Sequence, residues 1–301
     1  MLGYVCKYTP MELFEAMDTE ITRLEPSVTD FNHADTLMHA NICSYTKAVL
    51  EDVMEHDYEG VILTTCCDSI RRLYDTLKSQ FPDKFFFLLD IPRKFNDFAV
   101  TLYERQLKQM LTEYEAFSGK TLDLKRFVSM MQNKAALKKQ ENTRMSASAA
   151  SEKGNGQKLN IGIMGARCNN EIRQLLVDHG ANLLFDLTCT GLARDFSITE
   201  DQALHSYAAA LLNQIPCMRM LKAANREHFL DGFTDRLDGI IYHTVKFCDS
   251  YSYEYADFRQ RLDLPILLVE TDSTRQCAGQ VRTRVEAFME ELKVKKGLSL
   301  T

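Results

Sequence analysis

Cysteine is the residue type whose positions in this chain most clearly indicate chemistry. Six of the nine cysteines lie where a cofactor-binding α/β protein would need ligands, most of them directly after a short β-branched or aromatic run. These six are Cys43, Cys67, Cys168, Cys189, Cys217 and Cys248. Parallel sheets collect ligands at the carboxyl ends of their strands, because the loops diverge there and helix N-termini favour thiolates and cluster sulfides. The pattern therefore predicts, as its leading hypothesis, an iron-sulfur cluster protein.

Four predicted strands lead directly into these cysteines. Residues 60–65 precede the doublet Cys66-Cys67, 159–164 precede Cys168, 182–187 precede Cys189, and 239–245 precede Cys248. A single free cysteine is usually a small buried hydrophobe, and that interpretation is favoured for any one position, whereas the whole pattern favours ligands. Zinc is the less favoured metal, because the chain has no Cys-x-x-Cys pair and the six positions are widely dispersed.

The composition is that of an ordinary globular protein. Hydrophobic residues make up 45%, charged residues 26%, and the net charge of -6 argues against a nucleic-acid partner. The N-terminus has no basic segment followed by an apolar one, and no stretch approaches the roughly 18 apolar residues that span a bilayer. An odd number of dispersed cysteines fits a reducing compartment. We therefore expect a cytoplasmic protein without membrane contact.

The middle of the chain predicts a division into two domains. Residues 138–158 contain almost no large apolar residue and are rich in Ser, Lys, Gly and Gln, which is typical of a flexible linker. Its Gly-Asn-Gly is not a phosphate loop, because no strand precedes it and no Gly-Lys-Ser or Gly-Lys-Thr follows. We expect an N-terminal α/β domain over residues 1–137 and a C-terminal one over 159–301.

Strands and helices alternate on both sides of this linker. Strands are predicted over residues 2–5, 21–24, 60–65, 84–89, 159–164, 182–187, 239–245 and 265–270. Helices are predicted over residues 10–17, 44–55, 69–79, 96–117, 170–180, 200–215, 218–233 and 278–292. This alternation predicts an α/β fold of two doubly wound, Rossmann-like (flavodoxin-like) parallel-sheet domains, with a cluster-binding cleft between them.

Five sequence blocks, in order, resemble one known family. They are residues 3–13 (GYVCKYTPMEL), 41–47 (NICSYTK), 65–74 (TCCDSIRRLY), 238–249 (DGIIYHTVKFCD), and 265–272 (PILLVETD) followed by 279–288. These blocks are similar to the 2-hydroxyacyl-CoA dehydratase family, which also includes benzoyl-CoA reductase subunits and double-cubane cluster proteins. Each block alone is weak, but five in the right order are specific, and the similarity covers nearly the whole chain outside the linker.

The resemblance implies a set of cluster ligands. In the family, cysteines of the blocks around residues 43, 67 and 248 hold one [4Fe-4S] cluster, which implies Cys43, Cys67 and Cys248 here, with Cys66 as the alternative to Cys67. Three thiolates leave one iron open to substrate. Members with a double-cubane [8Fe-9S] cluster use three further cysteines; Cys189 and Cys217 match two of those positions, and Cys168 matches the third with a looser spacing.

The resemblance also implies a reaction and partners. The family removes the 2-hydroxyl of an acyl-CoA through a ketyl radical, using one low-potential electron from a separate ATP-hydrolysing activator protein. The partner subunit would be a second copy or a paralogue. This chain has less helical sequence before its first block, and a Ser/Ala-rich linker where relatives have a helical insertion. Two interpretations follow: a partner subunit completes the acyl-CoA site, or the substrate is smaller. A double-cubane reductase of a small molecule and a non-catalytic cluster carrier are the alternatives.

No catalytic residue is assigned from the sequence. Arg71 and Arg72 would suit a cluster or a CoA phosphate but are more typical of a solvated helix surface. Among the remaining candidates, structural or capping roles are favoured for His33, His39, His243, Glu270 and Asp272. Cys6 and Cys277 are interpreted as spare, although Cys6 lies inside the first family block and Cys277 lies between the two parts of the last one.

Overall fold

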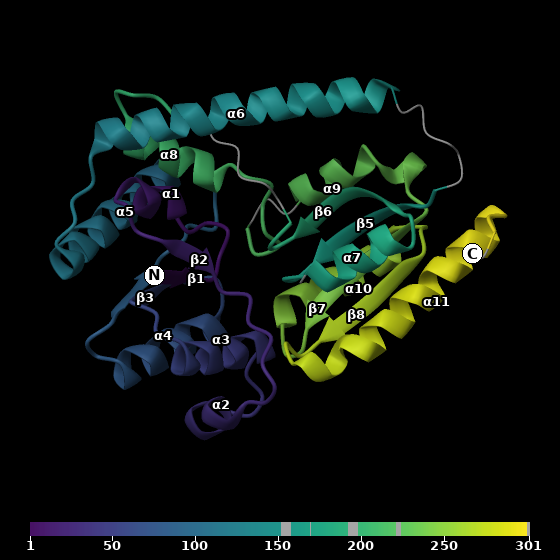
Figure 1. Ribbon diagram of the computed structural model, residues 1–301, viewed down its shortest axis with the longest axis horizontal. Helices are drawn as coiled ribbons and strands as arrows, with labels where there is room; N and C mark the ends of the chain where they lie inside the picture. The colour runs from purple at the N-terminus through teal and green to yellow at the C-terminus, as the bar shows by residue number, and fades with distance from the viewer. Residues whose placement is uncertain (152–157, 169, 192–197, 221–223, 300–301) are drawn as a thin grey trace. The chain divides into compact units, whose positions relative to one another are not determined.

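The strands of the protein form two parallel sheets. The computed structural model describes residues 1–151, 158–168, 170–191, 198–220 and 224–299. Within these ranges the strands form two four-stranded parallel sheets, ordered β2-β1-β3-β4 and β6-β5-β7-β8 (Figure 1). Their bounds are β1 Leu2–Tyr4, β2 Ile21–Arg23, β3 Gly60–Thr64, β4 Phe85–Leu89, β5 Asn160–Gly165, β6 Asn182–Thr188, β7 Gly239–Val245 and β8 Ile266–Thr271. The predicted α/β class and every predicted strand are confirmed.

Helices connect and cover these strands. Those that match predicted helices are α1 Met11–Ala16, α3 Ser44–Glu55, α4 Asp68–Gln80, α5 Asp97–Ser118, α7 Asn170–Asp178, α8 Ala203–Leu212, α9 Ala224–Asp231 and α11 Ala278–Lys296. Three described helices are missing from the sequence prediction: α2 Asn32–Leu37, α6 Leu124–Ser151 and α10 Asp249–Arg261. In α6 the buried residues Phe127, Val128 and Met131 recur at helical spacing, a signal that the sequence prediction missed.

The predicted linker over residues 138–158 is helical in its first part. Helix α6 continues to Ser151, because Ala, Lys, Gln, Glu and Met favour a helix once one has started. Residues 152–157 of this segment lie outside the described residues. A lack of large apolar residues therefore excludes a packed core but does not exclude a helix.

The chain divides into two compact units that do not follow its two halves. The first unit comprises Met1–Leu24, His56–Gly154 and Ala193–Lys222, and the second comprises Glu25–Glu55, Asn155–Leu192 and Ala223–Thr301. Helix α8 joins the first unit, where the ring of Tyr207 lies 5.1 Å from that of Phe127 and its hydroxyl donates to Glu12. This division differs from the predicted domains 1–137 and 159–301, because buried contacts distant in sequence decide it.

The two sheets share one strand order, in which the first and third strands of each unit are neighbours. In both, the chain runs outward to one edge through the second strand and then returns to the other side through the third. The direction of winding therefore reverses between β1 and β3 in the first unit, and between β5 and β7 in the second. The carboxyl ends of strands at such a reversal are where doubly wound proteins bind ligands.

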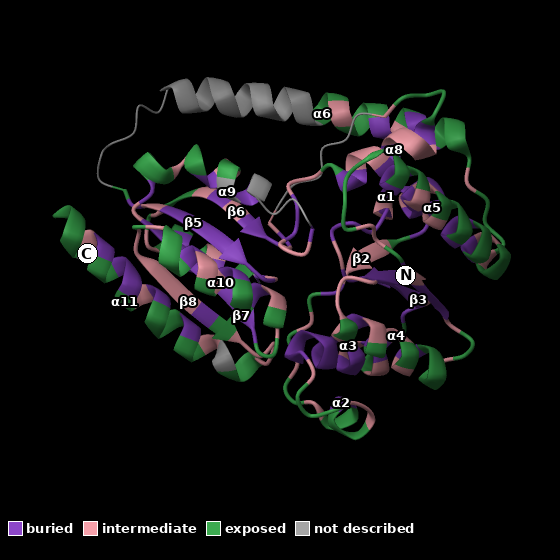
Figure 2. Cartoon of the chain, turned by 180° about the vertical axis from the view of Figure 1, so that it is seen from behind, coloured by how far each residue is buried: buried purple, intermediate pink, exposed green. Residues whose placement is uncertain are grey.

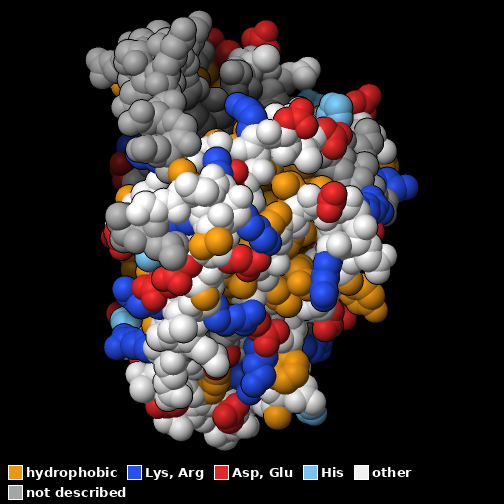
Figure 3. Space-filling view, turned by 90° about the vertical axis from the view of Figure 1, so that its right-hand side faces the viewer, with side chains coloured by type: hydrophobic (Ala, Val, Ile, Leu, Met, Phe, Trp, Pro, Cys, Tyr) orange, Lys and Arg blue, Asp and Glu red, His pale blue; other side chains and the backbone are white. Residues whose placement is uncertain are grey.

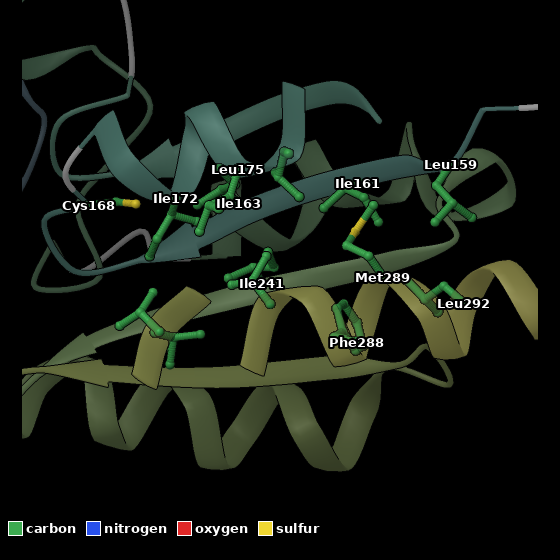
Figure 4. Packing of buried hydrophobic residues seen from close by; sticks show 14 residues of the cluster. Leu159, Ile161, Ile163, Cys168, Ile172, Leu175, Ile241, Phe288, Met289 and Leu292 are labelled. Atoms are coloured by element: carbon green, nitrogen blue, oxygen red, sulfur yellow. The ribbon is translucent and has the colours of Figure 1, made fainter. Parts of the chain in front are cut away.

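The second unit buries its main core on one face of its sheet. Side chains from α7, β5, β7 and α11 point toward one another there, among them Ile172, Ile163, Ile241 and Phe288 (Figure 4). Successive residues of a strand face opposite sides, so Tyr242 contacts Tyr255 of α10 instead, with ring centroids 5.4 Å apart. Helices therefore cover both faces of the sheet.

Burial follows the same layered plan in both units. Strands β3 and β7 are buried over their whole length, whereas the covering helices expose one side to solvent (Figure 2). On the face drawn in Figure 3, Lys and Arg side chains are interspersed with Asp and Glu, so no large field of one sign forms there. Among the described helices, none combines the length and the apolar character needed to cross a bilayer.

Candidate functional site

Cysteines lie at the winding reversal of both sheets. In the first unit Cys6 follows β1, and Cys66 and Cys67 follow β3. In the second unit Cys168 follows β5 and Cys248 follows β7. The prediction that cysteines collect at the carboxyl ends of strands is confirmed, and Cys6, interpreted as spare from the sequence, belongs to the same arrangement.

Cys43 and Cys248 form a thiol pair in the second unit. Cys43 directly precedes α3, Cys248 is the N-cap residue of α10, and the backbone N–H of Ser44 donates to the carbonyl of Lys246 at 3.1 Å. A hydrogen bond from the Cys248 thiol lowers the pKa of Cys43 to about 7, against the opposing effect of burial. The same contact raises the pKa of Cys248. The pair therefore holds a thiolate on Cys43 near neutral pH.

Cys189 lies close to this pair and is bound by a tyrosine that the sequence interpretation missed. Its Sγ lies 2.7 Å from the hydroxyl of Tyr251, which is 2% exposed. The charge of Cys189 also contributes to the raised pKa of Cys248, whose helix carries Tyr251. Tyr251 lies on α10, the helix that begins after Cys248, and this helix was not predicted from the sequence. The contact with Cys189 was missed for that reason.

A buried ion pair supports the tyrosines of α10 and β7. Arg226 donates from Nε to Glu254 at 2.7 Å, with side chains only 2% and 7% exposed. Glu254 also accepts the hydroxyl of Tyr242, whose pKa is raised by burial and by that carboxylate. Paired charges of this kind are costly to break one at a time, so the network fixes the position of α10 and of its N-cap cysteine.

Three thiols meet in the first unit. Cys66 accepts hydrogen bonds from the thiols of Cys6 and Cys67, which hold the pKa of Cys66 well below its usual range. The contact with Cys66 raises the pKa of both Cys6 and Cys67. Cys67 is the N-cap residue of α4. The doublet therefore does not act as two equivalent thiols, because the anionic form is favoured on Cys66.

Arg219 is the cation beside these thiols. Its Nη1 donates to the backbone carbonyl of Cys66, and its charge lowers the pKa of all three thiols. Sequence reasoning considered Arg71 and Arg72 for this role, but Arg72 pairs with Asp75 at 2.8 Å on the exposed side of α4. Arg219 follows α8 and belongs to no family block, so no sequence signal identified it.

Cys168 and Cys217 have different surroundings. Cys168 is fully buried in the hydrophobic cluster of the second unit, and burial raises the pKa of its thiol to about 12. Cys217 is buried in the first unit, where its backbone N–H donates to the hydroxyl of Tyr8 at 3.2 Å. The three candidates for a second cubane are thus spread over both units. The side chain of Cys277 lies outside the described residues.

The polar candidates have structural partners. His33 Nδ1 lies 2.7 Å from Glu51, and His39 Nδ1 accepts the N–H of Asn41 at 3.1 Å. Asp272 accepts the backbone N–H of Thr274 at 3.0 Å, which is the capping type of contact expected for it. The side chain of Glu270, on β8, is exposed.

His243 lines a small cavity of the second unit. It is 2% exposed, its Nε2 lies 3.0 Å from Thr271 Oγ1, and burial lowers its pKa to about 4, so the ring is neutral at pH 7. The cavity of about 70 Å³ is also lined by Tyr45, Arg167 and Cys168. The guanidinium of Arg167 lies 4.0 Å from the ring centroid of Tyr45. This cavity at the winding reversal has room for a small polar group.

The donor chemistry of these thiols fits an iron-sulfur cluster. Among the described His, Cys, Asp and Glu side chains, no group of three or more is placed so that it would hold a metal ion. Every cysteine described is a free thiol, and thiolates are the usual ligands of these clusters. Cys43, Cys67 and Cys248 also sit at helix starts, where the helix dipole favours anions.

Comparison with known proteins identifies the family. The family described as 2-hydroxyglutaryl-CoA dehydratase, D-component, matches residues 6–150 and 128–292. The chain is also similar to the (R)-phenyllactyl-CoA dehydratase beta subunit of Clostridium sporogenes, with 22% identity over 347 residues that cover 97% of this chain and 91% of that protein. The family match spans most of the chain and includes all of the cysteines that follow strands. The protein therefore belongs to the 2-hydroxyglutaryl-CoA dehydratase D-component family.

Proposed function

We propose that this chain is the iron-sulfur component of a 2-hydroxyacyl-CoA dehydratase, a lyase that removes the 2-hydroxyl group of an acyl thioester by radical chemistry. The observation that carries the proposal is the contact between the thiols of Cys43 and Cys248 in a member of this family. Cys43, Cys67 and Cys248 are the proposed ligands of one [4Fe-4S] cluster. Cys66 is the alternative to Cys67.

The protein's own residues supply binding, charge balance and orientation. Helix starts at all three ligand positions favour thiolates, and Arg219 adds a positive charge beside the Cys66-Cys67 doublet. When bound, the cluster would supply the single low-potential electron that dehydration of a 2-hydroxyacyl thioester needs. The chain has no phosphate loop, so an ATP-hydrolysing activator protein is the proposed electron source.

A partner subunit is part of the proposal. The similar protein of Clostridium sporogenes is named as a beta subunit, which supports an assembly of this chain with a paralogue or with a second copy. The proposed substrate class is a 2-hydroxyacyl-CoA. It is tested by following formation of the 2-enoyl-CoA from (R)-phenyllactyl-CoA and smaller 2-hydroxyacyl-CoA esters, with ATP, an activator protein and a candidate partner subunit present.

The double-cubane reductase is the second candidate, and one observation favours it. Cys189, one of the three additional cysteines, contacts Tyr251 on the helix that Cys248 caps, and its charge contributes to the raised pKa of Cys248. Against it, Cys168 lies in the hydrophobic core, where burial disfavours its thiolate. We therefore favour a single cluster, with Cys189 beside it.

Iron content tests both proposals. The chain is purified without oxygen and reconstituted, and iron and acid-labile sulfide are measured together with the electron paramagnetic resonance spectrum. About four irons per chain are expected for one cubane and about eight for a double cubane. The variants Cys43→Ala, Cys67→Ala and Cys248→Ala are each expected to bind less than about one iron.

Three matched variants sharpen this experiment. Cys66→Ala is expected to keep its iron if Cys67 is the ligand, and to lose it if the two roles are exchanged. Cys189→Ala and Cys217→Ala are expected to keep about four irons under the single-cluster proposal, whereas a double cubane would lose iron in both. A chain that stays free of iron after reconstitution, or that keeps its iron without Cys43 and Cys248, contradicts the proposal.

A further inference from the structure

The turn that follows β7 holds Phe247 in a backbone conformation that phenylalanine rarely adopts. Val245, the last residue of β7, accepts the backbone N–H of Cys248 at 2.8 Å, which closes a four-residue turn. Phe247 is the third residue of this turn and has a φ of 64°. Turns of this kind usually have glycine or asparagine at that position. A bulky residue there is an outlier that costs stability.

The turn is fixed from two sides. Ser44, the first residue of α3, donates from its backbone N–H and from its Oγ to the carbonyl of Lys246, at 3.1 and 3.3 Å. The backbone N–H of Lys246 donates to the carbonyl of Thr271 at 2.9 Å. Strained residues persist only where their surroundings over-determine the backbone. Phe247 therefore cannot relax without disturbing these hydrogen bonds.

The ring of Phe247 gains little from the fold in return. Its side chain is 43% exposed, and the Nζ atom of Lys246 lies 5.5 Å from the ring centroid. A cation–π contact at an exposed site is weak. Glycine would remove the strain, and the core does not need this ring. Strain without a structural benefit is typical of functional sites.

The position of Phe247 indicates which function the ring serves. The neighbouring strand β5 ends at Gly165 with a φ of 104°, and Ser273, two residues after β8, has a φ of 63°. Left-handed residues therefore lie at or just after the carboxyl ends of three adjacent strands. Doubly wound proteins bind their ligands at this edge. Phe247 also directly precedes Cys248, a proposed cluster ligand.

We infer that Phe247 is a specificity-determining residue, whose ring contacts the acyl side chain of the thioester substrate. The inference rests on the proposed function. A small molecule is favoured over a protein partner because the ring adjoins the residue at which the proposed chemistry takes place. Aromatic acyl groups are the preferred class, because pairs of aromatic rings attract each other beyond the burial of their area. The ring carries no proton to transfer, so it acts on the choice of substrate.

Two esters that differ only by a phenyl ring measure this choice. Phe247→Ala removes the ring but keeps a Cβ atom in the turn. Its kcat/KM is expected to fall at least about tenfold with (R)-phenyllactyl-CoA and less than about threefold with (R)-lactyl-CoA. Tyr253→Ala, which removes a 78% exposed ring from α10, is expected to keep both values. Equal losses with the two esters overturn the inference.

Fluorescence tests the contact without turnover. The chain contains no tryptophan, so Phe247→Trp introduces a single reporter at this position. In the iron-free chain, (R)-phenyllactyl-CoA is expected to shift the emission to shorter wavelength, whereas (R)-lactyl-CoA is expected to leave it unchanged. Tyr253→Trp is the control and should respond to neither ester. An unchanged emission of Phe247→Trp, or an equal response of both variants, overturns the inference.

Thermal unfolding tests the strain. Phe247→Gly and Phe247→Ala both lack the ring, but only alanine keeps the strained backbone, so the glycine variant is expected to unfold about 2–4 °C higher. Equal midpoints contradict the strain on which the inference depends. A midpoint of Phe247→Ala more than about 10 °C below that of the native chain would assign the ring to packing and overturn the inference.

Two further measurements separate this inference from its alternatives. If Phe247→Ala no longer assembles with the partner subunit, the ring belongs to a subunit interface and the inference is wrong. Iron uptake measures the proposed function separately. A chain that binds iron but shows no ester selectivity at Phe247 contradicts this inference alone. A chain that stays free of iron contradicts the proposed function, and the tryptophan response then decides the inference by itself.

Discussion

At the scale of single residues, each thiol takes its properties from its immediate neighbours. The pKa of Cys43 is about 7 because Cys248 donates to it, whereas the pKa of Cys168 is about 12 because the core surrounds it. Cysteines that look alike in sequence therefore differ in how readily they ionise to thiolates. The effect of immediate neighbours on the free energy of unfolding can be measured at two further residues, Tyr251 and His243.

Replacing Tyr251 with phenylalanine removes only the hydroxyl that lies 2.7 Å from Cys189 Sγ. We expect the free energy of unfolding to fall by about 1 kcal/mol, the usual net value of a buried hydrogen bond. Urea denaturation measures it. Tyr253→Phe is the matched control, since that side chain is 78% exposed and its loss of a hydroxyl is expected to have no effect. Equal stability of the two variants would contradict the role of the Tyr251 contact.

Buried His243 makes stability depend on pH. Its pKa in the folded protein is about 4, below the value of about 6.5 in the unfolded chain, because burial disfavours the charged ring. Its contribution is therefore fully present above pH 6.5 and is lost as the pH falls toward 4. We expect a loss of about 2 kcal/mol by pH 5 and about 3 kcal/mol below pH 4.

Denaturation of a matched pair of variants at pH 7 and pH 5 isolates this effect. His243→Asn removes the titrating ring, so the variant should lose about 2 kcal/mol less than the native chain between these pH values. His228 has a side chain that is 91% exposed, and His228→Asn should keep the native pH dependence. A native-like slope in His243→Asn would show that other groups cause the loss.

At the scale of elements, the turns after strands decide where the candidate ligands lie. Cys67 and Cys248 each serve as the N-cap residue of the helix that follows their strand. Strand β5 instead ends at Gly165, which has a φ of 104° and leads into the loop that buries Cys168. The loop that follows β5 therefore depends on a positive φ at Gly165, a backbone conformation that favours glycine.

Gly165→Ala is expected to disrupt this turn. An added Cβ would lie 2.1 Å from the carbonyl oxygen of His243, and the positive φ adds strain. We expect a loss of at least about 3 kcal/mol in the free energy of unfolding. Gly119→Ala is the control, because Gly119 also has a positive φ of 73° but no described neighbour within 4 Å of the added atom. The Gly119→Ala variant should lose only about 1 kcal/mol in the free energy of unfolding. Equal losses in the two variants would show that the positive φ, and not the clash with the His243 carbonyl, causes the effect at Gly165.

At the scale of the whole molecule, both units combine segments from distant parts of the chain. The second unit includes Glu25–Glu55 from the N-terminal part, and the first includes Ala193–Lys222 from the C-terminal part. Neither half of the sequence therefore contains a complete unit. For this reason the thiol of Cys43 contacts that of Cys248, and the backbone N–H of Cys217 donates to the hydroxyl of Tyr8.

Fragments test this exchange of segments. Residues 1–137 and 159–301, produced separately, are each expected to lack a cooperative thermal transition, because each lacks a segment that its compact unit buries. Circular dichroism during heating and the dispersion of amide proton shifts measure this, with the undivided chain of 301 residues as the reference. A sharp transition in the 159–301 fragment would contradict the assignment of residues 25–55 to the second unit.

Local sequence patterns alone determined the strands and the placement of cysteines at their ends. β-branched and aromatic runs such as residues 239–245 are buried on both faces and lead to a cysteine, so a short window of sequence carries the information. Helix α3 likewise has the bounds predicted for it, because its apolar residues recur at helical spacing. The family resemblance also rests on such short blocks, and the family match confirms it.

Only the tertiary structure decided which thiols touch. Cys43 meets Cys248, Cys6 meets Cys66, and Cys189 meets Tyr251, although each pair is far apart in sequence. The position of Arg219 and the burial of Cys168 were equally invisible, because they depend on how parallel strands pair and how helices cover them. Strand pairing across long connections carries no local signature, so the sequence identified the candidate ligands but not their neighbours.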